Sequence, residues 1–437
     1  MRWALALGLL AHGALAIPPG IVGAGAGVTP PPTGYSWPGA WTFSVVGPRT
    51  TFDPTTLRPS GKAYYVSTTG SDAAAGTEAA PLRSVHVAAA KADVVEIHIA
   101  AGEYGYGNAG TAPHGGFGGV SKTVLVKRWG AGSAILSTRL QDLVWTEDAG
   151  AWKVAVTGTV GSVWDSLAPD ADGMPVRLTL AADAAAVRAT AGTYYKDGGG
   201  VLWVHTADSR EPDAQIAAYR IDDSWESGTA ATAWTQYFED IDFAGGGPNI
   251  KGAGITFVMV RCTARYSRAG IDGVRIQSAA AAYLVDVTAE ANGNDGVKAN
   301  SSSGATPLLM ERVTARYNGW GDTTVGNGYS RHTGGVTLGV NCTFSGNYGP
   351  NMHDIGTSET WLVYCNASDS RGTSGRSVNY AMSWGGSTGA SKLWLYRCTS
   401  GPGASVAGIA TNSPGTIVYR GLYGDTTTNG TGTFGTY

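Results

Sequence analysis

One short pattern of apolar and polar positions returns eight times in the second half of the chain. Each copy is a stretch rich in β-branched and aromatic residues, followed by small and polar residues that are typical of turns. The copies are Phe238–Phe243, Val258–Ala264, Tyr283–Ala289, Leu309–Ala315, Leu338–Phe344, Trp361–Ala367, Trp394–Ser400 and Ile417–Tyr423. Short strands that recur in this way favour a solenoid of stacked β coils over a helical repeat.

One position in each copy, which we call the marker, measures the length of a coil. The markers are Ile241, Cys262, Val287, Val313, Cys342, Cys365, Cys398 and Gly421, at steps of 21, 25, 26, 29, 23, 33 and 23 residues. Two or three short strands with their turns need a length of this order, at roughly 3.3 Å per strand residue. All four cysteines are markers, so we expect them to be buried and reduced, as small stacked apolar groups.

Two further positions recur with the marker. The next position holds Thr263, Thr288, Thr314, Thr343, Asn366 and Thr399, and the fifth after the marker holds Ser267, Asn292, Asn318, Asn347 and Ser370. Side-chain amides stacked at one turn can hydrogen-bond from coil to coil. A second strand in each coil is expected to direct Val274, Val297, Tyr329, Met352, Met382 and Ile409 into the core.

The first strand of each coil departs from strict alternation. Three residues before the marker stand Met259, Leu284, Met310, Leu362, Leu395 and Val418, which alternation would turn outward while turning Glu311 inward. Either the strand bends, or a second apolar face is buried against a partner subunit.

Residues 63–104 resemble the opening of the pectate-lyase-like β-helix superfamily. The matching elements are Tyr65-Val66-Ser67, Gly70-Ser71-Asp72, Gly76-Thr77, Ala80-Pro81-Leu82 and Ala101-Gly102-Glu103-Tyr104. The resemblance implies an all-β, right-handed parallel β-helix whose open end is covered by a capping helix at about Ser84–Ala92. It implies little about function, because lyases, hydrolases, epimerases and non-catalytic spikes share this fold.

The chain divides into four expected segments. Residues 1–60 hold a short apolar stretch and a Pro- and Gly-rich arm, and residues 61–120 begin the β-helix. Residues 121–235 interrupt the repeat with hairpin-like strands, as insertions do in phage tail β-helix proteins, and residues 236–437 form the main coils. Residues 1–16 fit either a signal peptide or an anchor in a virion.

Composition narrows the function classes. Glycine supplies 65 of 437 residues and only 14% of residues are charged, as expected of a chain dense in tight turns. The formal net charge is −3 and no basic run occurs, so nucleic-acid binding through phosphate neutralisation is not expected.

Two coils are long, and both place their extra residues at the same turn. The loops Gly319–Gly326 and Arg371–Asn379 are therefore expected side by side, next to a strand face that points outward. Aromatic and basic groups in one groove suit an acidic polysaccharide, because rings pack on sugars and Arg pairs with carboxylates. The expected glycan-binding residues are Trp320, Arg275, Lys298, His332, His353, Arg371 and Arg376.

Catalysis at this groove is a weaker expectation. A lyase needs a base and a group that neutralises the substrate carboxylate, which Lys298, Arg331 and His353 could supply. A hydrolase needs two carboxyl groups, for which Asp322 and Asp354 are the best pair. No cofactor is expected and no CxxC zinc spacing occurs. Calcium on Asp240 and Asp242, on Asp286, or on Asp272 and Asp295 is the less favoured alternative to turn formation.

Three functions remain open at the level of the sequence. The first is a virion spike or tail receptor-binding protein, a homotrimer that engages host surface polysaccharide and joins other virion proteins through its N-terminal segment. The second is a secreted polysaccharide lyase or glycoside hydrolase. The third is a purely structural virion component.

Overall fold

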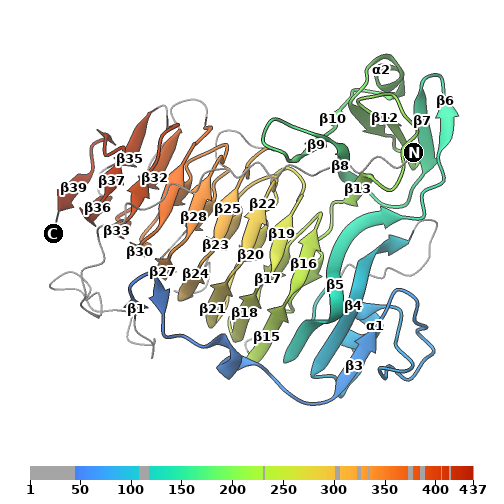
Figure 1. The fold of residues 1–437 in the computed structure, drawn as a ribbon, viewed down its shortest axis with the longest axis horizontal. Coiled ribbons are helices and arrows are strands. Elements are labelled where there is room, and N and C mark those ends of the chain that lie inside the picture. Colours follow the sequence, from blue (N-terminus) through green and yellow to red (C-terminus); the bar gives the residue numbers. More distant parts are fainter. Residues whose placement is uncertain are drawn as a thin grey trace, which may run out of the picture.

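The chain winds into a parallel β-helix (Figure 1). The computed structural model describes residues 45–107, 118–229, 232–300, 306–321, 326–332, 334–372, 377–383, 389–404, 406–412 and 415–436. Each main coil contributes one strand to each of three parallel sheets, so successive coils stack strand on strand. The all-β fold predicted from the repeat is confirmed. None of the helices in the described ranges has the length and apolar character needed to cross a membrane.

The three sheets take their strands in chain order. The first contains β15 (Trp234–Glu239), β18 (Ile255–Val260), β21 (Ala281–Val285), β24 (Leu308–Glu311), β27 (Val336–Val340), β30 (Glu359–Val363), β33 (Lys392–Tyr396), β36 (Thr416–Arg420) and β39 (Thr433–Thr436). The second contains β16 (Ile241–Ala244), β19 (Thr263–Arg265), β22 (Thr288–Glu290), β25 (Thr314–Arg316), β28 (Thr343–Ser345), β31 (Asn366–Ser368), β34 (Thr399–Ser400) and β37 (Tyr423–Gly424). The third contains β14 (Trp225–Glu226), β17 (Pro248–Ile250), β20 (Val274–Ile276), β23 (Val297–Asn300), β26 (Tyr329–His332), β29 (Met352–Asp354), β32 (Val378–Met382), β35 (Ala407–Thr411) and β38 (Thr428–Asn429).

A left-handed residue bends the chain just before each marker. These corner residues have φ between 50° and 57° and are Asp240, Arg261, Asp286, Arg312, Asn341, Tyr364 and Arg397. Because the chain turns there, Met259 and Cys262 both face the core, as do Leu284 and Val287 in the next coil. The prediction that the strand bends is therefore confirmed.

The register corrects the last copy of the repeat by one residue. Thr399 pairs with Tyr423, which places Leu422 at the marker position and Gly421 at the left-handed corner with φ 64°. A glycine at this corner looked like a marker because it takes the place of the polar corner residues of the other coils.

The predicted ladders lie inside the coils. All four cysteines are free and buried, as expected. The Asn292 Nδ2 donates to Asn318 Oδ1 over 2.9 Å, and Asn318 Nδ2 donates to Asn347 Oδ1 over 2.9 Å. From Asn347 the ladder continues through Asn351 and Asn379 rather than through Ser370. Buried amides joined in this way leave few donors unpaired, which stabilises the turn.

The outer face of the first sheet is also apolar, and residues 45–58, which we call the arm, run along it. The arm contains β1 (Val45–Val46), β2 (Arg49–Thr50) and a 3₁₀ turn, Pro54–Leu57. Val45 packs in a cluster with the stacked rings of Trp361 and Trp394, whose centroids are 4.2 Å apart. Phe52 stacks on Tyr283 at 4.6 Å. The apolar outer face consists of other residues than those the sequence analysis considered, and the chain's own arm packs against it.

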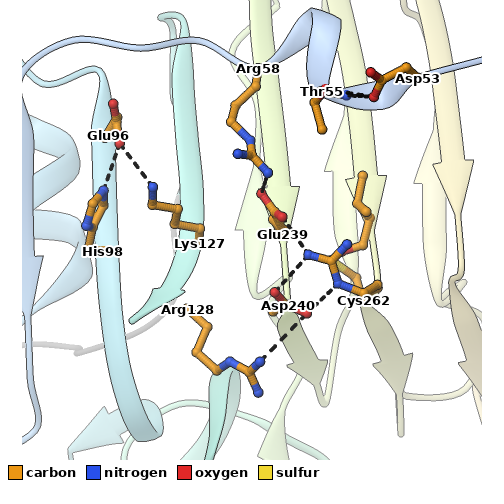
Figure 2. Close-up of polar contacts among 12 residues, drawn as sticks. Asp53, Thr55, Arg58, Glu96, His98, Lys127, Arg128, Glu239, Asp240 and Cys262 are labelled. Carbon is orange, nitrogen blue, oxygen red and sulfur yellow. Dashed lines mark hydrogen bonds and ion pairs between the residues drawn. The ribbon is translucent and has the colours of Figure 1, made fainter. Parts of the chain in front are cut away.

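Charged contacts hold the arm at its C-terminal end. Figure 2 shows Arg58 reaching from the arm to Glu239 on β15, with Asp240 at the following corner. Arg261 joins the same group, with its Nε 2.9 Å from Asp240 Oδ1. On the neighbouring strands, Glu96 contacts His98 and Lys127 (Figure 2).

The N-terminal end of the solenoid carries the predicted cap. Helix α1 (Val85–Ala90) lies within the predicted range and buries Val85, Ala88 and Ala89. It follows β3 (Ala63–Val66) and precedes β4 (Glu96–Gly107). The Ser84 hydroxyl at its start donates to Asp72 over 2.6 Å, which ties the helix to the preceding loop.

The inserted antiparallel region is smaller than the range predicted for it. Strand β5 (Val124–Gln141) lies in that range but pairs in parallel with β4, β15 and β16, so it belongs to the coils. The sequence of β5 lacks the turn residues of the repeat, so the repeat pattern did not identify it as part of a coil. The insert proper contains β6 (Thr146–Asp148), β7 (Ala151–Ala155), β8 (Val160–Pro169), β9 (Pro175–Arg177), β10 (Thr179–Leu180), α2 (Ala184–Ala189), β11 (Thr193–Lys196), β12 (Val201–His205) and β13 (Ile216–Arg220). It stands beside the coils at one end of the solenoid (Figure 1).

Candidate functional site

Left-handed corners after the second sheet form the surface on which the insert docks. These corners immediately precede the amide ladder, so the corner side chain points outward while the next residue points inward. Tyr266, Ala291 and Tyr317 take this place, with φ of 64°, 53° and 57°. Trp164 of β8 packs on Tyr266, with ring centroids 4.8 Å apart. A left-handed conformation is costly for bulky residues, and here it brings their rings against the insert.

A pocket of about 280 Å³ lies between the insert and these corners, and we call it the junction pocket. Trp164, Asp170, Asp172, Met174, Pro175, Val176 and Arg177 line it from the insert, and Ala291, Tyr317, Trp320 and Tyr348 line it from the coils. Its volume is just below the range of roughly 300–1,000 Å³ for small-molecule sites. Aromatic rings from both sides face acidic and basic groups in one concave space.

Trp320 lies at the centre of this junction rather than standing free in a groove. Its ring meets Trp164 edge-on at 5.7 Å, and its Nε1 donates to the Ala291 carbonyl over 3.0 Å. The Arg177 guanidinium sits 4.1 Å from the ring centroid. The residue is half-buried, so its ring both holds the insert and lines the pocket.

Arg371 joins the insert to the coils. It pairs with Asp172 through two contacts of 2.6 and 2.9 Å, and with Asp369 at 2.9 Å. Its guanidinium lies 5.1 Å from the Tyr317 ring, which precedes the loop of Trp320. The start of the second long turn thus lies near Tyr317, and the turn at Asn347 lies between the two long turns in coil order. The expected pairing of Arg371 with a glycan acid is opposed by the carboxylates that already neutralise it.

The outward strand face of the third sheet gathers a second polar cluster. Arg275, Lys298, Ser330 and His353 occupy successive coils in register. Lys298 Nζ lies 3.6 Å from Asp295 Oδ2 and 3.9 Å from Asp272 Oδ1. The Arg275 Nε lies 3.1 Å from the other oxygen of Asp272, Oδ2. Both carboxyl groups are buried at the start of their strands.

Burial dominates the electrostatics of this cluster. Burial and the neighbouring Asp295 raise the pKa of Asp272 to about 6, against the opposing effects of Lys298 and Arg275. Burial tends to lower the pKa of Lys298, but the two carboxylates raise it above its ordinary value. Burial and the Lys298 charge lower the pKa of His332, whose Nε2 is 3.3 Å from the Ser330 hydroxyl. The group could exchange protons, although Ser330 itself is buried.

Arg331 and Asp354 lie inside the solenoid, which corrects their expected catalytic role. Arg331 Nη1 donates to Thr337 over 2.7 Å and its Nε donates to the Gly334 carbonyl over 2.7 Å. Asp354 accepts a hydrogen bond from Thr360, while its Oδ1 has no hydrogen-bond partner among the described residues. Both residues are fully buried, so neither reaches a polymer outside. Strand alternation explains this: Tyr329 and Arg331 share the inward face, and Ser330 and His332 the other.

The acidic residues considered for calcium mostly have cationic or hydroxyl partners. Asp240 pairs with Arg261, Asp286 pairs with Arg312 at 2.6 Å, and Asp242 accepts from Thr263 over 2.6 Å. Across the described ranges, no group of three or more His, Cys, Asp or Glu side chains has a metal-binding arrangement. Asp322 and Arg376 lie outside the described residues.

Among the pocket residues only Trp320 was singled out from the sequence, and the missed residues include Trp164, Arg177 and Tyr348. Trp164 and Arg177 lie about 150 residues before the coils they contact. Tyr348 follows the ladder residue Asn347, so the repeat could have placed it at the same turn as Trp320. The insert contains no repeat that relates it to a particular coil. The coil against which it packs could therefore not be predicted from the sequence.

Comparisons with known proteins assign the chain to no family. No family model and no curated protein match the chain. A complex of XylC with xylose has a TM-score of 0.48 at 10% identity, covering 84% of this chain and 70% of that one. A glycoside hydrolase has a TM-score of 0.39 at 9% identity over 86% and 97%. Pectate lyase Pel9A has a TM-score of 0.32 at 14% identity over 80% and 79%.

Proposed function

We propose that this β-helix protein binds a carbohydrate polymer at the junction pocket. The observation that carries the proposal is the pocket's lining of Trp164, Tyr317, Trp320 and Tyr348, beside Arg177 and acidic side chains. A flat ring covers the apolar face of a sugar, while polar groups at the rim fix its hydroxyls. The pocket is open to solvent at the flank of a long solenoid, where a polymer can continue along neighbouring coils.

A polysaccharide panel tests this proposal, with Tyr348→Ala as the pocket variant. Tyr348 is half-buried and lines the pocket, and its loss should weaken binding of a recognised polymer about tenfold. Tyr195→Ala is the matched control, because Tyr195 is a half-buried ring that packs on Trp203 in the insert, outside the pocket lining. Calorimetry gives the affinity and thermal melting checks folding. Unchanged affinity in a folded Tyr348→Ala protein would contradict the proposal.

We further propose that the polymer lies on a host cell surface and that the protein serves as a virion spike. The arrangement of an extended arm, a long solenoid and a binding region on the solenoid's flank supports the proposal of a virion spike. Homotrimer formation and attachment to other virion proteins through residues 1–60 belong to this proposal. Light scattering of the full chain tests the trimer, and the intact mass of native protein tests the anchor. Loss of 16 residues would instead favour the secreted alternative.

The alternative of a polysaccharide lyase or hydrolase has its own observation. Asp272 and Asp295 begin strands of adjacent coils with Lys298 near both carboxyl groups, and burial raises the pKa of Asp272 to about 6. Both carboxyl groups are buried, so this alternative requires that the outward strand face open to a substrate. Adjacent coils are about 4.8 Å apart, near the carboxyl separation of retaining glycosidases. Release of reducing ends without a new double bond indicates hydrolysis, whereas ultraviolet absorbance of an unsaturated product indicates elimination. Asp272→Asn should abolish either activity, and a fully active Asp272→Asn protein would end this alternative.

A further inference from the structure

Arg177 is the cationic side chain of the junction pocket, and the binding proposal does not say what its charge recognises. It ends β9 and is half-buried, with its guanidinium 4.1 Å from the centre of the Trp320 ring. The only hydrogen bond of the guanidinium among the described residues is a long one, from Nη1 to the Leu178 carbonyl at 3.5 Å. A guanidinium carries five N–H donors, so most of its donors remain available to a ligand in the pocket.

Other arginines at this end of the molecule have carboxylate partners. Arg210 pairs with Asp165 at 2.6 Å, Arg188 with Asp148 at 2.8 Å, and Arg371 with Asp172 at 2.6 Å. Arg177 forms no ion pair within the described part of the chain. The titratable groups that act on it are the phenols of Tyr194 and Tyr348, and burial lowers its pKa. A half-buried cation without an anion is unfavourable, because its lost hydration is not replaced.

The shape of the surroundings specifies which anion would complete the site. Trp320 covers one face of the planar guanidinium, which leaves its edge for in-plane hydrogen bonds. An Arg edge matches a carboxylate with two parallel hydrogen bonds, a geometry that Lys cannot reproduce. Asp172 on the pocket wall pairs with Arg371, so it opposes an incoming carboxylate less than a free acid would. Asp170, the other acid of the lining, accepts hydrogen bonds from the backbone N–H groups of Asp172 and Met174.

We infer that Arg177 makes the junction pocket selective for an anionic sugar, with the sugar's carboxylate on the guanidinium edge and its ring near Trp320 and Tyr348. This inference rests on the proposed function, because it names the class of sugar that the same pocket takes. It assigns the selectivity to the insert, whereas the coils supply aromatic surface.

The test compares uronate and sialate polymers with their carboxyl-reduced forms, and includes a sulfated neutral glucan. The wild-type full chain should bind a recognised carboxylated polymer about tenfold more tightly than its reduced form, with the preference weakening as salt rises. Arg177→Gln should remove the preference while keeping the affinity for the reduced polymer. Arg177→Lys should restore it only in part. Arg188→Gln, which removes a paired arginine of the insert, is the control and should leave the preference unchanged.

The possible outcomes separate the two proposals. Equal binding of both polymer forms by the wild type overturns the inference and leaves the binding proposal standing. A preference that survives in Arg177→Gln also overturns it. Tighter binding of the sulfated glucan than of every carboxylated polymer assigns the arginine to a sulfate instead and overturns the carboxylate assignment. Binding of no polymer by the wild type ends the proposed function, and the inference with it.

Discussion

The coil interior and the junction pocket are built by opposite means. Inside the coils, Asn292, Asn318 and Asn347 repeat one hydrogen bond from turn to turn, and each amide is fully buried. The junction is built from residues that do not recur in the repeat and that come from segments far apart in the sequence, namely Trp164, Trp320 and Arg177. Trp320 and Arg177 remain half-buried. Repetition therefore stabilises the solenoid, whereas single, partly hydrated contacts leave room for a ligand.

The largest expected effect is in the interior ladder. Asn318→Ala should lower the free energy of unfolding by about 3–4 kcal/mol, because the donors of Asn292 and the acceptor of Asn347 lose their buried partner. Chemical denaturation measures the loss. Thr314→Ala, at a half-buried position of the same coil, is the control and should cost much less. A loss no larger than that of the control would show that the ladder is not a source of stability.

The interior polar cluster should make stability depend on pH. Burial raises the pKa of Asp354 to about 7, above its ordinary value of 3.8. The folded protein then binds more protons than the unfolded chain between these values, so stability is fully present at low pH and falls as pH rises toward 7. Asp354→Asn should flatten this dependence and stabilise the protein at pH 8 relative to pH 5 by roughly 2 kcal/mol compared with wild type. Melting at a series of pH values checks this, and identical profiles would contradict it.

Trp320 packs against the insert and also lines the junction pocket, so its removal should affect both stability and binding. Trp320→Ala should destabilise the protein by about 1–2 kcal/mol through lost contacts with Trp164 and Arg177. It should also weaken polysaccharide binding by a similar amount. Melting and calorimetry on the same variant decide the matter. A stability loss with unchanged binding would make Trp320 a packing residue only and would remove it from the site.

The smallest effect is expected at the cysteine ladder. Cys365→Ser should cost about 1 kcal/mol, because the buried Sγ lies 3.4 Å from the Gly339 carbonyl and a hydroxyl could keep that partner. Burial raises the pKa of Cys262 to about 12, so thiol reagents should label the native protein slowly. Rapid labelling of all four thiols before unfolding would be inconsistent with the closed interior.

The sequence predicted what repeats and missed what does not. The cysteine and asparagine ladders follow from recurring residues at one position, and α1 followed from a resemblance at the first coil. Arg331 and Asp354 were misplaced although alternation from Tyr329 and Met352 would have turned them inward. The contacts of Trp320 could not be predicted, because no pattern in the insert's sequence indicates which corner of the coils the insert contacts. The apolar positions covered by the arm were visible, but the segment that covers them was not.

The arm has a consequence for the order of events during synthesis. Thr50 donates to Glu311, a contact that joins residues 261 positions apart. The arm leaves the ribosome long before the strand that it finally covers exists, so its apolar side chains must wait in solution or in temporary contacts. Closing such a long loop is slow compared with stacking one coil on the next. Arm docking is then a late folding step, and an unfinished solenoid would expose the tryptophans of its first sheet to other chains.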